Sequence, residues 1–597
     1  MEKLIYAILS SRIKKFWVFV VVIAAMIGSV MLIPTKLVLA KMLPGKSANT
    51  FTIYIDTATN ASIAQTQKVT TCVSKELQKE PEVTDMEIYL GQGAPLDYAG
   101  LVKGSALKSL KNQAEIVVNL SDKQHRKEPS YMIVHRIRPT IQESCGKLTP
   151  NTSIRFVEMP SGPPTLATIV IELYGKDDAL LRRTSQKSAQ ILHQTEGLVD
   201  IDIMNDDLYT KYDIIPDTEK IIRSGLGVDQ VNQVIYLAFK GMPVAVKNTQ
   251  NQQDQVPIFL RLDDETRTIN YESREALMQK LSSLKLMNNM GMMVPLSEVM
   301  ILKKSTSSPT IFRKNLKKMV SITAECDMVS QVYPLLEARE KIMKELSNEY
   351  HITKVAGINT FMFDLELLHK GTGETLLLRW DGEMKVSLDT FRDLGGAFIA
   401  ALILMFLLMV VYYKSFALSG IVLIGSFLSI IGVLAGHWVT DKIQLYFTHT
   451  HFFLTATSLI GFISLMGISA RSSLLLIDFS RSLMEEKGMK KKEAIAYATA
   501  TRAKPIMLTA VAIILGSLLL ATDPIFGGLG IALIFGSMAA TLVSLFFIPV
   551  LMDNSKAMLP KNYTFDESMP KKSLGCILGE NIRQLFYVRG RKKNKRN

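Results

Sequence analysis

The stretch GISARSSLLLIDFSR, residues 467–481, lies within a long apolar run, yet Arg471 stands in its middle and Asp478 near its end. A charge at the centre of a membrane helix costs about 2.5–3.5 kcal/mol on insertion scales, so such residues usually face a protein interior and pair there. Two turns of helix separate the two residues, which places them on one face. Two simpler interpretations stay open: Arg471 extends its side chain to the lipid headgroups, and Asp478 lies at the membrane surface.

Six apolar runs are long enough to cross a bilayer, which takes about 20 residues. We expect membrane helices near 16–33, 394–413, 416–438, 452–477, 505–522 and 529–551. The first run follows basic residues, as in a signal peptide, but Pro34, Thr35 and Lys36 follow it in place of a small-x-small cleavage site. We therefore expect a retained helix.

Basic residues cluster at the N-terminus, in the link 481–504 and in the tail RGRKKNKRN. Because cytoplasmic loops carry the excess of Lys and Arg, six crossings place all three clusters in the cytoplasm and residues 37–393 on the far side of the membrane. The net charge of +14 is then mostly a consequence of topology. No basic patch interleaved with aromatic residues stands out, so we expect no nucleic-acid partner.

The segment 37–393 alternates strand and helix patterns. Its first part reads strand, helix, strand, strand, helix, strand, which is the ferredoxin-like βαββαβ order. The same pattern begins again at TIVIELYG (168–175), breaks off after 204, and resumes at MVSITAEC (319–326) with a helix and a last strand at 351–357. The fold class we predict is therefore a six-helix membrane bundle plus two ferredoxin-like α+β subdomains, the second split by an insertion.

The expected boundaries follow from these patterns. They are 1–36 for the N-terminus and first membrane helix, 37–164 for the first subdomain, 165–220 with 311–393 for the second, 221–310 for the inserted subdomain, 394–552 for five membrane helices and 553–597 for a basic cytoplasmic tail.

Few residues suggest metal or disulfide chemistry. The 4 Cys include no Cys-x-x-Cys pair, which argues against a zinc site or a disulfide scaffold. Cys72 and Cys145 fall on the two predicted helices of the first subdomain, where a bond is sterically possible and the sequence leaves its formation open. We read the Met-rich run 287–300 as an apolar hairpin turning at Asn288–Asn289 in which Met fills gaps, rather than a Cu(I) site. THTH (448–451) reads as an exposed polar loop, and no cofactor or catalytic constellation is expected.

Three motifs carry a resemblance: GISARSSLLLIDF, then ATRAKPIMLTAVAIILG, then DPIFGGLGIALIFGSMAATLVSLFFIPVL. Together they resemble the end of a resistance-nodulation-division (RND) permease of the AcrB/AcrD/AcrF type. KMLPGKSANTFTIYIDT and EMPSGPPTLATIVIELYG are similar to segments that open the third and fourth porter subdomains, and the insertion is similar to the docking half-domain. The resemblance covers nearly the whole chain but only the second half of such a permease.

The resemblance implies a proton-driven exporter of drugs, lipophiles or metal ions. In the family, two Asp on the first half take up the proton and a Lys of the second half pairs with them. Arg471 falls at that Lys position, Thr509 at a hydroxyl of the relay, and Arg502 at a basic residue preceding it. Asp478, seven residues after Arg471, is a further candidate for an ion pair or proton site. The implied partners are a separate first-half chain carrying the Asp pair, a periplasmic membrane fusion (adaptor) protein, a TolC-like outer-membrane channel, and further copies in a trimer.

The departure from Lys to Arg matters because a buried Lys can lose its proton whereas Arg stays charged. Arg471 is thus a candidate counter-charge rather than a proton carrier. Three alternatives stay open beside the split exporter. They are a truncated, non-transporting remnant, a homodimeric half permease that uses Asp478 as its proton site, and a membrane-anchored periplasmic scaffold.

Overall fold

The computed structural model describes residues 1–45, 47–59, 61–159, 162, 165–249, 255–263, 274–355 and 363–559. The chain divides into two compact units. The main unit comprises Met1–Thr57, Ser62–Met204 and Lys314–Asn597, and the inserted unit comprises Ala58–Ala61 and Asn205–Arg313.

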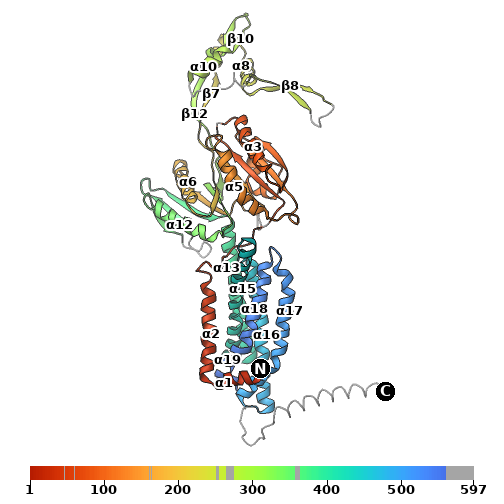
Figure 1. Ribbon diagram of the computed structural model, residues 1–597. Coiled ribbons are helices and arrows are strands. Elements are labelled where there is room, and N and C mark those ends of the chain that lie inside the picture. The colour runs from red at the N-terminus through yellow and green to blue at the C-terminus, as the bar shows by residue number, and fades with distance from the viewer. Residues whose placement is uncertain are drawn as a thin grey trace, which may run out of the picture. The chain divides into compact units, whose positions relative to one another are not determined.

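Within the described residues, six helical segments are long and apolar enough to cross a membrane, as predicted. Figure 1 shows them side by side in one bundle. They are α2 (Arg12–Met31), α13 (Glu383–Tyr413), α14 (Phe416–Phe427) with α15 (Ile430–Thr448), α16 (Ala456–Lys487), α17 (Lys491–Ala521), and α18 (Gly527–Leu542) continued by a π-helical turn (Val543–Phe547) and α19 (Ile548–Asn554). A short helix α1 (Glu2–Ser10) precedes them and buries Ile5 and Leu9 in the bundle.

The structure corrects the expected place of Pro505. The sequence pattern put it near a helix start, but it lies inside α17, which begins at Lys491. The residues before it, KKEAIAYATATRAK, are good helix formers, so the helix starts well before the apolar run. Pro is tolerated inside membrane helices because neighbouring groups satisfy the freed backbone carbonyl.

The first α+β subdomain contains a four-stranded antiparallel sheet in the order β2-β3-β1-β4. Its elements in chain order are β1 (Thr50–Asp56), α3 (Ile63–Leu77), β2 (Val83–Leu90), α4 (Tyr98–Lys103), a 3-10 turn (Ser105–Leu107), β3 (Gln113–Leu120), α5 (Ser130–Gly146) and β4 (Ser153–Val157). Alternate residues Phe51, Ile53 and Ile55 of β1 share one core with Val69 of α3 and Ile133 of α5. The two long helices therefore cover one face of the sheet.

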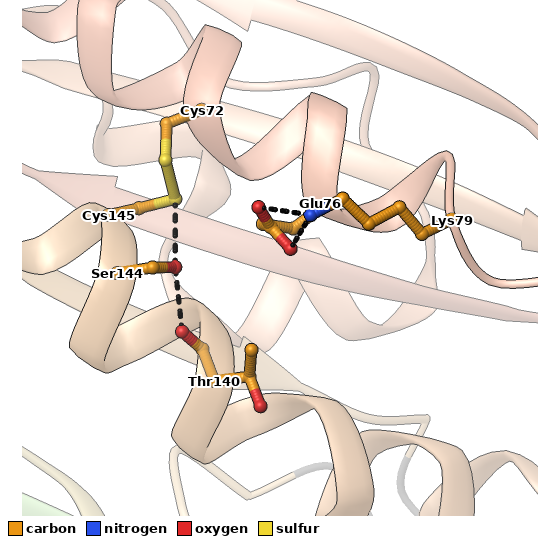
Figure 2. The surroundings of a disulfide bond; sticks show 6 residues. All are labelled: Cys72, Glu76, Lys79, Thr140, Ser144 and Cys145. Carbon is orange, nitrogen blue, oxygen red and sulfur yellow. Dashed lines mark hydrogen bonds and ion pairs between the residues drawn. A yellow bond between two sulfur atoms is a disulfide. The ribbon is translucent and has the colours of Figure 1, made fainter.

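Those two helices are covalently linked. Cys72 of α3 and Cys145 of α5 form a disulfide with their Cα atoms 5.7 Å apart, as Figure 2 shows. Beside the bond, Ser144 donates to the Thr140 carbonyl over 2.7 Å and its Oγ lies 3.6 Å from the Cys145 sulfur. The possibility that the sequence left open is thus realised in the structure.

The second α+β subdomain is built on β5 (Ile169–Tyr174), α6 (Asp178–His193), β6 (Leu198–Met204), β14 (Lys317–Cys326), α12 (Val332–Leu346), β15 (Tyr350–Lys354), β16 (Leu365–His369) and β17 (Thr375–Asp381). The strand order is β13-β14-β5-β17-β16-β15, where β13 is the short strand Arg313–Lys314, and β6 also pairs with β14. The last strand expected from sequence, β15, pairs with β16 rather than completing the repeat beside β5.

Strand β17, which the sequence analysis did not identify, occupies the position beside β5. All residues of β5 are buried, so that strand needs a partner on both sides. Leu376, Leu378 and Trp380 of β17 alternate toward the core. Strand β15 exposes most of its side chains, as suits the edge of a sheet.

The inserted unit pairs β7 (Thr210–Pro216) with β12 (Met300–Thr306), β8 (Met242–Lys247) with β9 (Val256–Leu260), and β10 (Lys285–Met287) with β11 (Met293–Pro295). Its helices are α7 (Thr218–Arg223), α8 (Val228–Ile235) continued by a π-helical turn (Tyr236–Lys240), α10 (Arg274–Ser283) and α11 (Leu296–Val299). By its pairing, β7 belongs to this unit, although the expected boundary at 221 placed it in the second subdomain.

The Met-rich run forms the predicted hairpin between β10 and β11. Asn288 shapes its turn, because the Asn288 side-chain oxygen accepts from the amides of Met290 and Met292 over 2.9 Å each. The expectation that Met fills gaps there was wrong, since Met290 is 82% exposed and the other methionines near the turn are also exposed.

Candidate functional site

Helix α16 contains the charged stretch 467–481, with Arg471 and Asp478. Thr455 caps its N-terminus by accepting from the Ser458 amide, and Gly488 ends it in a left-handed conformation. Arg471 lies in the middle of this helix with an exposed side chain. Among the described residues, Arg471 has no hydrogen bond or ion pair. A permanent charge therefore stands unpaired on the outer surface of the bundle.

Asp478 lies on the same helix but bonds elsewhere. The Tyr412 hydroxyl of α13 donates to Asp478 Oδ2 over 3.2 Å, and the adjacent Tyr413 hydroxyl donates to the Leu474 carbonyl over 3.4 Å. The serines near Arg471 do not solvate it either: Ser469 is buried and donates to the Gly425 carbonyl of α14 over 3.1 Å. Asp478 thus fastens α13 to α16.

Arg502 and Thr509 lie on α17. The Arg502 guanidinium stacks over the Phe479 ring of α16 at 4.9 Å, a cation–π contact that joins the two helices. Thr509 is exposed, and its hydroxyl donates to the Ile506 carbonyl of its own helix over 2.8 Å. No hydrogen bond or ion pair among the described residues connects any two of Arg471, Asp478, Arg502 and Thr509. The chain brings these residues to neighbouring helices and does not join them.

A buried polar cluster at α15 and the loop after it was missed from sequence. His437 is fully buried, with Nδ1 2.8 Å from the Val433 carbonyl and Nε2 2.8 Å from Ser458 Oγ. Asp441 accepts from His451 Nδ1 and from the Phe452 amide over 3.0 Å each. We expected the THTH loop to be freely exposed. That expectation was wrong, because Asp441 accepts hydrogen bonds from the loop and orders it. The signal for this was a lone His and Asp inside an apolar helix.

A cavity of about 170 Å³ lies where the two α+β subdomains meet the membrane helices. We call it the junction cavity. Its charged and titratable lining is Lys41, Lys103, Tyr131, Arg138, Glu158, Glu325, Cys326, Asp327, Glu383 and His451. These residues come from segments far apart in the chain, so no local pattern could have revealed the cavity. Within the described part of the chain, no group of three or more His, Cys, Asp or Glu is arranged to hold a metal.

Arginine side chains join the two subdomains beside the junction cavity. Arg138 of α5 pairs with Asp200 of β6 at 3.2 Å and with Asp327, just after β14, at 2.9 Å. Arg155 of β4 bridges Asp56 of β1 and Asp202 of β6. Each arginine therefore extends from the first subdomain to at least one carboxylate of the second, and Arg155 also pairs with Asp56 of its own subdomain.

Six helices long and apolar enough to cross a membrane, together with a large two-subdomain α+β region, define the class of this protein as a polytopic membrane protein. The family model described as the AcrB/AcrD/AcrF family matches residues 2–359 and 368–553. The chain belongs to this family, and the resemblance to RND permeases drawn from sequence is confirmed.

Individual relatives are distant. The swarming motility protein SwrC of Bacillus subtilis strain 168 is 21% identical over 541 residues, covering 89% of this chain and 45% of that protein. The multidrug export protein AcrF of Escherichia coli K12 is 22% identical over 91% of this chain and 48% of its own length. A crystal structure of a heavy metal efflux pump superposes with a TM-score of 0.67 at 18% identity, covering 92% of this chain and 51% of that chain. The chain thus spans about half the length of the curated relatives it matches.

Proposed function

We propose that this chain forms the second half of a proton-driven RND exporter of drugs, lipophiles or metal ions, which a first half carrying the Asp pair completes. The observation that carries the proposal is Arg471, an unpaired cation on the exposed face of a membrane helix. An unpaired charge at that depth is costly, so a carboxylate partner outside the described residues would offset the cost. By the resemblance to RND permeases, that partner would be the Asp pair of a first half.

The neighbouring residues take roles consistent with this assignment. Arg471 stays charged and would hold the partner acids ready to release a proton, since an adjacent cation lowers a carboxyl pKa. Thr509 would offer a hydroxyl to the same relay from α17. Arg502 is held by Phe479 and Asp478 by Tyr412, so both would act mainly by fixing α16 against its neighbours. A homodimer that uses Asp478 instead would require that hydrogen bond to break during each cycle.

The same proposal covers topology and assembly. We place both termini in the cytoplasm of a bacterial inner membrane and the α+β region in the periplasm, where the Cys72–Cys145 disulfide has the oxidising compartment it needs. We class the two subdomains as ferredoxin-like porter subdomains, supported by the β2-β3-β1-β4 order of the first. The inserted unit would dock toward a TolC-like outer-membrane channel, with an adaptor protein and a trimeric assembly.

The test replaces Arg471 in cells that express this chain with a first half at matched membrane levels. Arg471→Ala should abolish resistance to a transported compound while assembly survives, because the partner acids would then hold their proton too tightly. Arg471→Lys should retain part of the activity, since it keeps the charge. Thr509→Ala should be milder than Arg471→Ala, because it removes a hydroxyl and no charge.

A matched control is Arg481→Ala, which removes a cation near the end of the same helix, where Arg481 lies 3.9 Å from Glu485. It should export normally. If Arg471→Ala exports as well as the parent, Arg471 is only a tolerated interfacial charge and the relay assignment fails. If the parent confers no resistance with any first half, the non-transporting remnant or the scaffold replaces the exporter.

A further inference from the structure

The junction cavity contains more carboxylates than cations. Its lining includes four carboxylates, Glu158, Glu325, Asp327 and Glu383, and three permanent cations, Lys41, Lys103 and Arg138. A fifth carboxylate, Asp200, reaches Arg138 from behind the lining. Carboxylates that outnumber cations in a confined space repel one another, and binding a proton relieves that repulsion.

The ion pairs show which carboxylates of the cavity have no close cation. Lys103 pairs with Glu325 at 2.6 Å, and Glu325 also accepts from the Thr168 amide over 3.2 Å. Arg138 is engaged by Asp200 and Asp327, so Glu158 reaches it only at 3.9 Å.

Glu383 and Lys41 complete the count. The Glu383 side chain makes no ion pair or hydrogen bond with any described residue. Lys41 is the remaining cation, and its ammonium lies 5.4 Å from the centre of the Phe453 ring. Glu158 and Glu383 therefore share one cation that is bound to neither.

Three glutamates of the cavity come from three different parts of the main unit, so their mutual repulsion acts between those parts. Glu158 follows β4 of the first subdomain, Glu325 ends β14 of the second, and Glu383 begins the membrane helix α13. Repulsion among them acts to separate three parts of the main unit. We propose that Glu158 takes up a proton in the junction cavity and that its ionisation loosens the packing of the two subdomains and α13 around that cavity.

The electrostatics agree with this choice. Burial raises the pKa of Glu158 to about 7, the charge of Arg138 opposes that rise, and the neighbouring Glu325 adds to it. By contrast, the pKa of Glu325 is held low despite burial, because Lys103 and Thr168 stabilise its charge. The charged and titratable groups that line the cavity with Glu158 are Lys41, Lys103, Tyr131, Arg138, Glu325, Cys326, Asp327, Glu383 and His451. Outside the lining, His135 pairs with Asp327, Asp200 with Arg138 and Asp441 with His451.

The sign of the pH dependence follows from the raised pKa. The folded chain holds this proton between the ordinary glutamate pKa and about 7, whereas the unfolded chain releases it. The stabilisation is therefore complete only below the ordinary glutamate pKa, falls as the pH rises toward 7, and is fully lost above about 7. Glu158→Gln is permanently neutral, so the folded state of this variant should lose no stability from residue 158 over that pH range.

The experiment uses the purified full chain in detergent and requires no transport, so it is independent of the exporter proposal. Hydrogen exchange of the segments 153–159 and 319–328 is compared between parent and Glu158→Gln at equal pH. We expect the smallest difference at pH 4.5, an exchange of the parent that becomes progressively faster than that of the variant up to pH 7, and a constant, several-fold difference from there to pH 8.5. As the pH rises over the same range, the melting temperature of Glu158→Gln should increase relative to that of the parent.

Two further variants keep the test decisive. Glu143→Gln removes an exposed carboxylate of α5 that pairs with Lys147, and it should leave both pH profiles unchanged. Glu158→Asp keeps a titratable carboxyl and should keep the pH dependence. A difference between parent and Glu158→Gln that is constant with pH, or no difference at all, overturns the proposal, because a merely structural role of Glu158 predicts one of these results.

Discussion

At the scale of single residues, Gly382 connects the second subdomain to the membrane. It follows β17 and precedes α13 with φ +85°, a backbone conformation that side chains rarely adopt. The amides of Glu383 and Met384 then donate to the carbonyls of Ala167 and Thr168 over 3.2 Å each. A Cβ atom at Gly382 would lie 2.5 Å from the Ala167 carbonyl oxygen. The helix can leave the sheet in this direction only through a glycine.

Gly382→Ala should therefore destabilise the chain by about 1–3 kcal/mol from the backbone conformation alone, with more from the steric clash. The measurement is the melting temperature of the full chain in detergent. Gly395→Ala is the matched control, because Gly395 lies inside the same helix with open space around it, where alanine stabilises by about 0.5–1 kcal/mol. Equal melting of Gly382→Ala and the parent would show that the connection is adjustable.

The disulfide makes a second prediction at this scale. Cys72→Ser should lower stability by about 2–4 kcal/mol, because an open chain gains conformational freedom on unfolding. Reductant should lower the melting temperature of the parent and leave that of Cys72→Ser unchanged. Cys326→Ser, which replaces the free cysteine among the described residues, should keep the sensitivity to reductant. Quantitative thiol labelling of Cys72 and Cys145 in the folded, oxidised protein would contradict the bond.

At the scale of elements, helix α5 carries two arginines in different environments. Arg138 is 4% exposed and faces Asp200, whose side chain is 2% exposed. Arg136, two residues earlier, pairs with Glu80 and Glu128 on the surface. Substituting each of the two arginines therefore measures how burial changes the contribution of an ion pair to stability.

Arg138→Met should destabilise the main unit by about 3–5 kcal/mol, because it leaves a buried carboxylate without its cation. Arg136→Met should cost about 0–1 kcal/mol, since water screens exposed pairs. Denaturant unfolding of the full chain in detergent gives both values. Similar costs for the two variants would mean that the pairs between the subdomains contribute no more than surface pairs.

Local patterns explain which elements could be predicted. Hydropathy found the six membrane helices, and alternation of apolar residues found the βαββαβ order of the first subdomain. Strand β17 was not predicted, because the repeated strand–helix pattern of the second subdomain is interrupted before it. Its partner β5 also lies far earlier in the chain. The same limit applies to the sites. Arg471 was identifiable because a charge in an apolar run is visible locally, whereas Glu158, Glu325 and Glu383 meet only through tertiary packing.

At the scale of the whole molecule, the distribution of charge and the disulfide point to one orientation. An even number of crossings puts the N-terminus and the end of α19 on the same side of the membrane as the link between α16 and α17. That link follows Glu485, Glu486 and Lys487 and continues into Lys490, Lys491 and Lys492, and basic links stay in the cytoplasm. The proposed periplasmic side for the α+β region agrees with the Cys72–Cys145 disulfide, because disulfides persist in oxidising compartments.

Cysteine labelling in intact cells tests this orientation, in a background with Cys326→Ser and Cys576→Ser. Met290→Cys, at an exposed turn of the inserted unit, should react with a membrane-impermeant maleimide added outside. Glu486→Cys, exposed in the link between α16 and α17, should react only after the membrane is permeabilised. The two positions are matched in being exposed, so a difference in labelling reports the side of the membrane rather than burial. The reverse pattern would place the α+β region in the cytoplasm, where neither the disulfide nor an outward path for export would have a physical basis.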